Sequence, residues 1–122
     1  MTGSLDLATR AARAASEKQG SDILVLQVRD LIAITDYFVI VSGANDRQVK
    51  TIAEEVERSL REAGEKPLRR EGRREGRWVL LDYVDFVVHV FRQEEREYYE
   101  LERLWSDAPL IDWERAAASS RG

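Results

Sequence analysis

The chain has no cysteine, one histidine and two prolines among its 122 residues. The lack of cysteine excludes disulfides and thiolate metal ligands, and it fits a reducing cytoplasm. A conventional zinc site is excluded as well, because one imidazole cannot supply the several nitrogen or sulfur ligands that zinc requires. No apolar run approaches the roughly 20 residues that cross a bilayer, so we expect a soluble, cytoplasmic protein without a membrane partner. Residues 1–20 are charged and rich in alanine, and we expect no secretory signal there.

Hydrophobic residues make up 43% of the chain, which is enough for one core and predicts a single domain. We place this domain at residues 1–107 and interpret residues 108–122 as a C-terminal tail that is partly flexible. The net charge of −4 argues against a general nucleic-acid binder. The charge is nevertheless uneven, because residues 66–77 are mainly basic and residues 94–107 are mainly acidic. Each segment is either a solvated surface or a surface for a charged partner.

Hydrophobic periodicity predicts a layered α/β (α+β) fold, in the order αββαββα, with a mixed five-stranded sheet flanked by helices. Ser4 is the candidate cap of the first helix, while Asn45 and Gly64 mark the start and end of the second. The last two strands are joined too tightly for a helical crossover, which predicts an antiparallel hairpin. The expected helices cover residues 5–18, 45–64 and 93–105, and the expected strands cover residues 23–28, 37–41, 68–71, 77–83 and 85–91.

Asp82 and Asp85 are candidates for a metal or general-acid pair. Their separation of three would put them on opposite faces of a continuous strand, so only a turn could bring them together. Stabilising that turn through backbone N–H groups, or contacting a partner, are the alternatives. His89 lies in a predicted strand, and a half-buried side chain satisfied by one hydrogen bond is the simpler interpretation than catalysis. We therefore expect no catalytic residue, no metal and no cofactor.

Ser42 and Gly43 precede a predicted helix, where many α/β proteins hold phosphate groups. Neither a GxGxxG nor a GxxxxGK[ST] motif is present, and Asp46 in the first helical turn would repel a phosphate. A divergent nucleotidyltransferase-like phosphoryl-transfer enzyme is thus an alternative function. A small dimeric scaffold with another protein partner is a third.

Aromatic side chains lie among carboxylates in the last predicted helix. Tyr98, Leu101 and Trp105 would share one face of a continuous helix, while Tyr99 would stand about 100° away. Trp78 opens a predicted strand directly after the basic segment. Aromatic residues surrounded by charge are typical of interface anchors. We expect at least two of Trp78, Tyr99 and Trp105 to be exposed enough to bind a partner.

Several segments in order resemble the ribosomal silencing factor family, also called the Iojap family. The similarity covers roughly residues 5–107 and is most specific at residues 35–40, 42–53, 78–83, 85–91 and 97–105. Two positions depart from the family pattern. Val84 stands in a turn where the family usually has glycine, and Asn45 replaces a serine at a helix cap.

The resemblance implies a fold related to nucleotidyltransferases but without their catalytic acids, and an activity of binding. It implies a translation repressor that attaches to the large ribosomal subunit through large-subunit ribosomal protein fourteen. Bound there, it would sterically prevent the small subunit from joining when nutrients are scarce, as in stationary phase. The family also implies a homodimer when the protein is off the ribosome.

The surface implied for this contact lies on the last strands and the last helix. The aromatic pattern adds Trp105 to the residues that the resemblance implies. We also expect the basic segment to touch peripheral rRNA phosphates. The expected protein-contact residues are Trp78, Leu80, Asp82, Tyr99, Leu101 and Trp105, and the expected phosphate-contact residues are Arg69, Arg70, Arg73 and Arg74.

Overall fold

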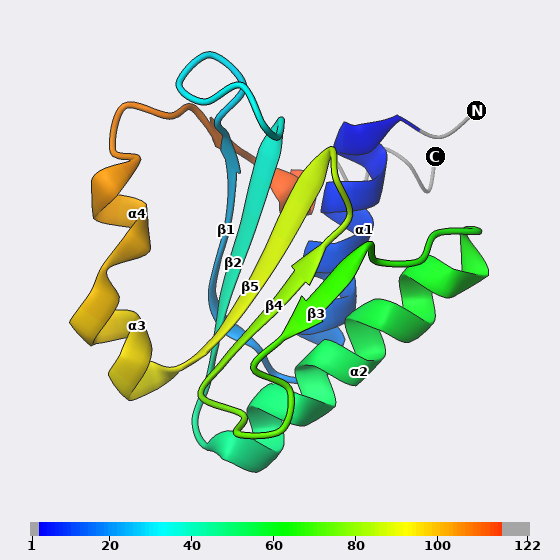
Figure 1. The fold of residues 1–122 in the computed structure, drawn as a ribbon, viewed down its shortest axis with the longest axis vertical. Helices are drawn as coiled ribbons and strands as arrows, with labels where there is room; N and C mark the ends of the chain where they lie inside the picture. Colours follow the sequence, from blue (N-terminus) through cyan, green and yellow to red (C-terminus); the bar gives the residue numbers. More distant parts are fainter. Residues whose placement is uncertain (1–2, 116–122) are drawn as a thin grey trace.

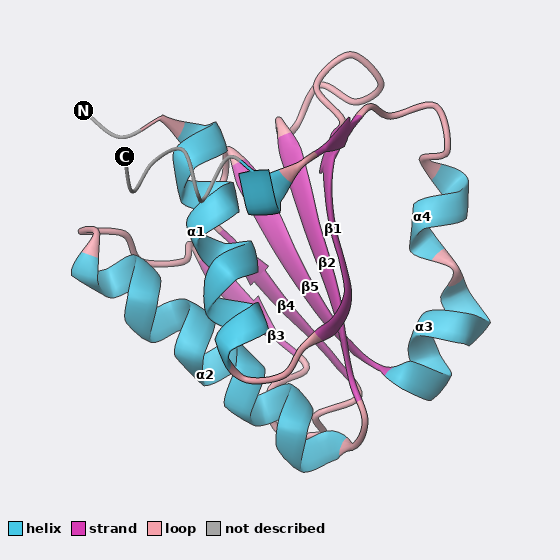
Figure 2. Cartoon of the chain, turned by 180° about the vertical axis from the view of Figure 1, so that it is seen from behind, coloured by secondary structure: helices cyan, strands magenta, loops and turns pink. Residues whose placement is uncertain are grey.

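The computed structural model describes residues 3–115, which form a mixed sheet between two layers of helices (Figure 1). Two helices cover one face of the sheet and two short helices lie on the other, as the view from behind also shows (Figure 2). The helices are α1 (Ser4–Glu17), α2 (Asp46–Glu62), α3 (Gln93–Tyr99) and α4 (Leu101–Leu104). The strands are β1 (Ser21–Gln27), β2 (Tyr37–Gly43), β3 (Arg69–Glu71), β4 (Trp78–Asp82), β5 (Phe86–Arg92) and β6 (Leu110–Ile111).

The strands follow the order β3-β4-β5-β2-β1-β6 across the sheet. β2 and β5 pair in parallel at the centre, and every other neighbouring pair is antiparallel. β2 is buried along its whole length, as a strand covered on both faces should be. The structure confirms the predicted mixed sheet and the β4–β5 hairpin, and it places β3 at one edge.

The expected five-stranded sheet is wrong, because the described residues form six strands. Leu110–Ile111 lies in the segment interpreted as a tail, yet it pairs with β1. Trp113 follows, and its Nε1 donates to the backbone oxygen of Ile23 at 3.2 Å. Two residues are too few to show a period, so hydrophobic alternation could not reveal this strand. The remainder of the expected tail, residues 116–122, lies outside the described residues.

Of the N-caps predicted for the first two helices, only the one of α2 is confirmed. Asn45 Oδ1 accepts a hydrogen bond from the backbone N–H of Gln48 at 2.9 Å, which confirms it as the cap of α2. Gly64 follows α2 with φ +86°, as a glycine just beyond a helix end commonly does. Ser4 is not the cap of α1. It is the first helical residue, and Gly3 occupies the cap without a side-chain hydrogen bond.

The predicted last helix is two helices, which corrects the expected element order. Glu100 separates α3 from α4 with φ +44° and ψ +50°, the left-handed conformation. The chain bends there, so that α3 and α4 form an angled pair beside the sheet (Figure 1). We call residues 93–104 the elbow. No glycine or proline marks the break in the sequence, so helix propensity alone does not predict it.

The turn between β4 and β5 places Val84 in an unfavourable conformation. The N–H of Asp85 donates to the carbonyl oxygen of Tyr83 at 2.9 Å, and Val84 between them has φ +73°. This is a γ-turn with positive φ at its centre, which a β-branched residue strongly disfavours. Asp82 Oδ1 accepts the N–H of Val84 at 2.8 Å. The turn-stabilising role is therefore confirmed for Asp82.

Val84→Gly is expected to raise the free energy of unfolding by roughly 0.5–1 kcal/mol. Relief of a left-handed β-branched residue is worth about 1–2 kcal/mol, and the added freedom of the unfolded chain removes part of that gain. The melting temperature should rise by about 2–4 °C. Ile34→Gly is the matched control, because Ile34 is also exposed and β-branched but has no positive φ, and it should not be stabilised. An unchanged or lower melting temperature for Val84→Gly would contradict the strain.

Candidate functional site

Three expected contact residues alternate along β4 and share one face of the sheet. Trp78, Leu80 and Asp82 are half-buried, whereas the intervening Val79 and Leu81 are fully buried in the core on the α1 and α2 side. The three therefore face the side that carries the elbow. Trp78 and Asp82 stand about 13 Å apart along the strand, since a strand rises about 3.3 Å per residue. Trp78 and Asp82 therefore cannot contact the same side chain of a partner, and lie at the two ends of an elongated surface.

Trp78 is held in place from beneath and from beside. Its Nε1 donates to Nδ1 of His89 at 3.1 Å, and its ring stacks on Phe91 with centroids 4.7 Å apart. Tyr99 of the elbow lies at its side, with ring centroids 5.0 Å apart. The orientation of Trp78 is thus fixed before any partner arrives, which lowers the entropic cost of binding.

Two tyrosines at the end of α3 complete an aromatic surface, which we define as Trp78, Tyr98 and Tyr99. Tyr99 is 48% exposed and Tyr98 is 82% exposed, and their rings meet edge to face at 5.0 Å. Tyr98 is not among the contact residues expected from the sequence, which places it on one helical face with Leu101 and Trp105. The break at Glu100 separates Tyr98 from both, and no sequence signal reveals that break.

Trp105 and Leu101 lie on the inner side of the elbow. Both are half-buried and pack against the smaller of two core clusters. The Trp105 ring meets Phe38 edge to face at 5.7 Å, and its Nε1 is buried without a hydrogen-bond partner among residues 3–115. Of Trp78, Tyr99 and Trp105, Tyr99 is exposed and the other two are half-buried, so the expectation that at least two of them are exposed enough to bind a partner stays a prediction.

The electrostatics around the aromatic surface are set by carboxylates of the elbow. The side chain of Glu94 is 81% exposed and lies 3.7 Å from Arg92, and that of Glu100 is 50% exposed and lies 2.9 Å from Arg103. Glu97 is exposed and forms no ion pair with a described residue, and acids outnumber bases along the elbow. Asp82 at the far end of β4 is less available. Its side chain is only 15% exposed, and its Oδ2 lies 3.1 Å from Nη2 of Arg69. The charge near the aromatic surface is therefore mainly negative, which suits a basic partner.

Most of the expected phosphate-contact arginines are engaged within the molecule. Arg69 pairs with Asp82, Arg70 Nε lies 2.8 Å from Glu57 Oε1, and Arg73 Nη1 lies 3.6 Å from the same oxygen. Glu57 is only 4% exposed, so these pairs tie β3 and the turn after it to α2. Arg74 is exposed and forms no ion pair with any residue that the structure describes.

His89 is buried, at 5% exposure, rather than half-buried as the sequence indicated. Its Nδ1 accepts from Trp78, so the imidazole is neutral with its proton on Nε2. Burial lowers the pKa of His89 to about 4, because desolvation disfavours the imidazolium. His89 supports Trp78 from below through this hydrogen bond, while its Nε2 is buried without a hydrogen-bond partner among residues 3–115.

Stability is expected to fall as the pH drops from about 6.5 to about 4. The pKa of His89 is lowered in the folded state to about 4, so between about pH 6.5 and pH 4 the imidazole is protonated in the unfolded chain and neutral in the folded chain. The loss should approach ~3 kcal/mol, because one pKa unit corresponds to about 1.4 kcal/mol. Denaturant unfolding at several pH values measures it. In His89→Asn the asparagine side chain can accept the hydrogen bond from Trp78 but does not titrate, so the free energy of unfolding should depend less on pH above pH 5. An unchanged pH dependence in this variant would contradict its assignment to His89.

The segment considered for phosphate binding has its polar groups already bonded. Ser42 is fully buried, and its Oγ accepts from Nη1 of Arg96 at 2.9 Å. A hollow of about 440 Å³ lies at the start of α2, where Arg92 Nη1 pairs with Oδ1 of Asp46 at 3.0 Å. Within residues 3–115, no three His, Cys, Asp or Glu side chains group closely enough to hold a metal ion. None of the described helices has the length and apolar character needed to cross a membrane.

The fold and site together define a layered α/β domain whose exposed feature is an aromatic surface with carboxylates beside it. The sequence model described as "Ribosomal silencing factor during starvation" matches residues 2–122. The ribosomal silencing factor RsfS of Bacillus subtilis is 47% identical over 102 residues, covering 84% of this chain and 86% of that protein. The crystal structure of a Chromobacterium violaceum protein superposes with a TM-score of 0.84 at 34% identity, covering 86% and 88% of the two chains.

A second crystal structure, from Bacillus halodurans, has a TM-score of 0.78 at 36% identity, covering 88% of this chain and 98% of that one. The chain therefore belongs to the ribosomal silencing factor family. Membership associates it with the ribosome and with the regulation of translation, and it confirms the resemblance found in the sequence.

Proposed function

We propose that this chain is a translation repressor that binds the large ribosomal subunit and sterically blocks its association with the small subunit. It acts under nutrient limitation, by occupancy and not as an enzyme. The observation that carries the proposal is the aromatic surface of Trp78, Tyr98 and Tyr99. Preoriented aromatic side chains with charged neighbours are the usual anchors of protein interfaces, and the family is associated with the ribosome.

The partner that we propose is large-subunit ribosomal protein fourteen, as the family resemblance implies. Ribosomal proteins are basic as a class, so the exposed carboxylates of Glu94, Glu97 and Glu100 would favour encounter with one. Leu80 and Asp82 extend the proposed contact along β4, and Leu101 and Trp105, which are half-buried against the smaller core cluster, complete it beneath the elbow.

Contact with rRNA phosphates is a smaller part of the proposal. Arg74 supplies it directly because it is exposed and forms no ion pair with a described residue. Arg69, Arg70 and Arg73 contribute only by exchanging their present carboxylate partners for phosphate.

We also propose that the protein works in the cytoplasm, that it is a homodimer when free, and that its fold is related to nucleotidyltransferases without their catalytic acids. A homodimer buries part of its surface, and a partner that competes for the same surface would release the monomer. None of these statements is needed for the steric mechanism.

Co-sedimentation with purified ribosomal subunits tests the proposed function. The protein is expected to pellet with isolated large subunits and to stay in the supernatant with small subunits. Titration of salt should weaken the binding only moderately, because aromatic contacts carry most of it. Binding to the small subunit alone, or to neither subunit, would contradict the proposal.

A further inference from the structure

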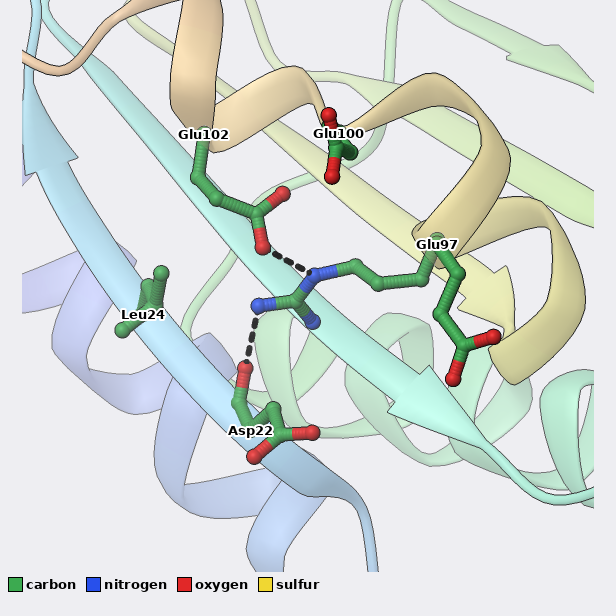
Figure 3. A pocket seen from close by; sticks show the side chains of 6 residues that line it. Asp22, Leu24, Glu97, Glu100 and Glu102 are labelled. Carbon is green, nitrogen blue, oxygen red and sulfur yellow. Dashed lines mark hydrogen bonds and ion pairs between the residues drawn. The ribbon is translucent and has the colours of Figure 1, made fainter.

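Arg96 of α3 is a buried cation that the contact surface itself does not use. Its side chain is 7% exposed and lies at a hollow of about 410 Å³ between the elbow and β1. Nε donates to Glu102 Oε2 at 2.8 Å, and Nη2 donates to the carbonyl oxygen of Asp22 at 2.8 Å. Both bonds are drawn as dashed lines in Figure 3. Nη1 donates to Ser42 Oγ at 2.9 Å, so one guanidinium joins α3, α4, β1 and β2.

The guanidinium connects two places where the backbone is irregular. Asp22 has φ +49° where the register of β1 shifts against β2, and Glu100 has φ +44° at the break of the elbow. A left-handed residue other than glycine costs about 1–2 kcal/mol and persists only where its surroundings hold it. Arg96 provides that support on both sides, since it binds the Asp22 carbonyl directly and the residue two positions beyond Glu100.

We infer that Arg96 is a positioning residue that fixes the angle of the elbow and thereby places Tyr99 beside Trp78 for the ribosomal partner. The elbow begins directly after β5, and Tyr99 follows Arg96 by less than one helical turn. A change in the Arg96 contacts therefore moves Tyr99 relative to the sheet. The role in binding rests on the proposed function, whereas the role in holding the elbow concerns this chain alone.

The chemistry of the site requires arginine in particular. The planar guanidinium of Arg96 donates to three acceptors that come from three different elements. The ammonium group of a lysine, on a shorter side chain, cannot reach all three with that geometry. The charge also needs Glu102, because a buried guanidinium without a carboxylate is strongly destabilising. Arg96→Lys keeps the positive charge but loses the planar arrangement of donors, so it tests the hydrogen-bond geometry independently of the charge.

The first experiment reports on the elbow without any ribosome. In a chain carrying Trp78→Phe and Trp113→Phe, Trp105 is the remaining tryptophan, and it lies against Phe38 on the inner side of the elbow. Arg96→Lys is expected to move its emission toward the red and to increase quenching by acrylamide at 20 °C. Arg58→Lys is the matched control, because Arg58 of α2 also binds two carboxylates but at 50% exposure.

The second experiment measures affinity for large subunits in the otherwise unchanged chain. Arg96→Lys should weaken binding by about 5- to 30-fold, whereas Arg58→Lys should stay within about twofold. If Arg96→Lys does not fold, Glu102→Gln removes the same pairing from the partly exposed side and is expected to give both effects. A lower melting temperature with unchanged Trp105 emission and unchanged affinity would overturn the inference. A Trp105 shift in a chain whose unsubstituted form binds no ribosomal subunit would refute the proposed function and leave the elbow role standing.

Discussion

Tyr99→Ala is expected to weaken binding to the large ribosomal subunit by about 30- to 1000-fold, because central aromatic anchors contribute about 2–4 kcal/mol. Tyr99 is 48% exposed, so its outer part is free for a partner while its inner part contacts Trp78. The folded chain should change little, since the side chain is not in a core cluster. Quantitative co-sedimentation at a fixed salt concentration measures the change.

Two substitutions serve as controls for Tyr99→Ala. Tyr99→Phe keeps the ring and should retain affinity within about threefold, the value of one exposed hydroxyl. Leu5→Ala removes a partly exposed apolar side chain from α1, on the opposite face of the sheet, and should have no effect. Equal affinities for Tyr99→Ala and Leu5→Ala would show that the aromatic surface is not the contact.

Phe91→Ala is expected to lower the free energy of unfolding by about 3–5 kcal/mol, the usual cost of removing a buried phenyl ring. Phe91 is fully buried in β5 and supports Trp78 with stacked rings 4.7 Å apart. The loss is a large part of the total stability of a typical domain, roughly 5–15 kcal/mol, and should lower the melting temperature by about 10–20 °C. Thermal unfolding followed by circular dichroism measures it.

The same substitution should also weaken ribosome binding at temperatures where the variant remains folded, because Trp78 loses its platform. Phe91→Leu is the control, since it keeps most of the apolar volume and should lose less than half as much stability. If Phe91→Ala lowers the melting temperature by less than about 4 °C, Phe91 does not support the site in the way described.

The parts of the fold that follow from local rules could be predicted from the sequence. The cap at Asn45, the left-handed Gly64 and the hydrophobic face of α2 are all short-range features, and all are present. The β4–β5 hairpin could be predicted as well, because its connection is too short for any helical crossover. These features need no knowledge of what lies across the molecule.

The features that depend on distant partners could not be predicted. The break at Glu100 needs Arg96 to reach Asp22, which lies more than 70 residues earlier in the chain. Tyr98 before the break is exposed, whereas Leu101 and Trp105 beyond it pack inward, so the three do not share the face that a continuous helix would give them. Arg70 of β3 and Arg73 of the following turn both pair with Glu57 on α2, a contact that the basic segment by itself does not reveal. In each case a tertiary contact overrides the local pattern.

The most direct test of the proposed function is a subunit-joining measurement. Large subunits are incubated with increasing amounts of the protein, small subunits are added, and light scattering records the fraction of joined ribosomes. Joining is expected to fall in proportion to occupancy of the large subunit, and Tyr99→Ala is expected to restore joining at the same concentrations. Full occupancy of the large subunit with undiminished joining would contradict the steric mechanism.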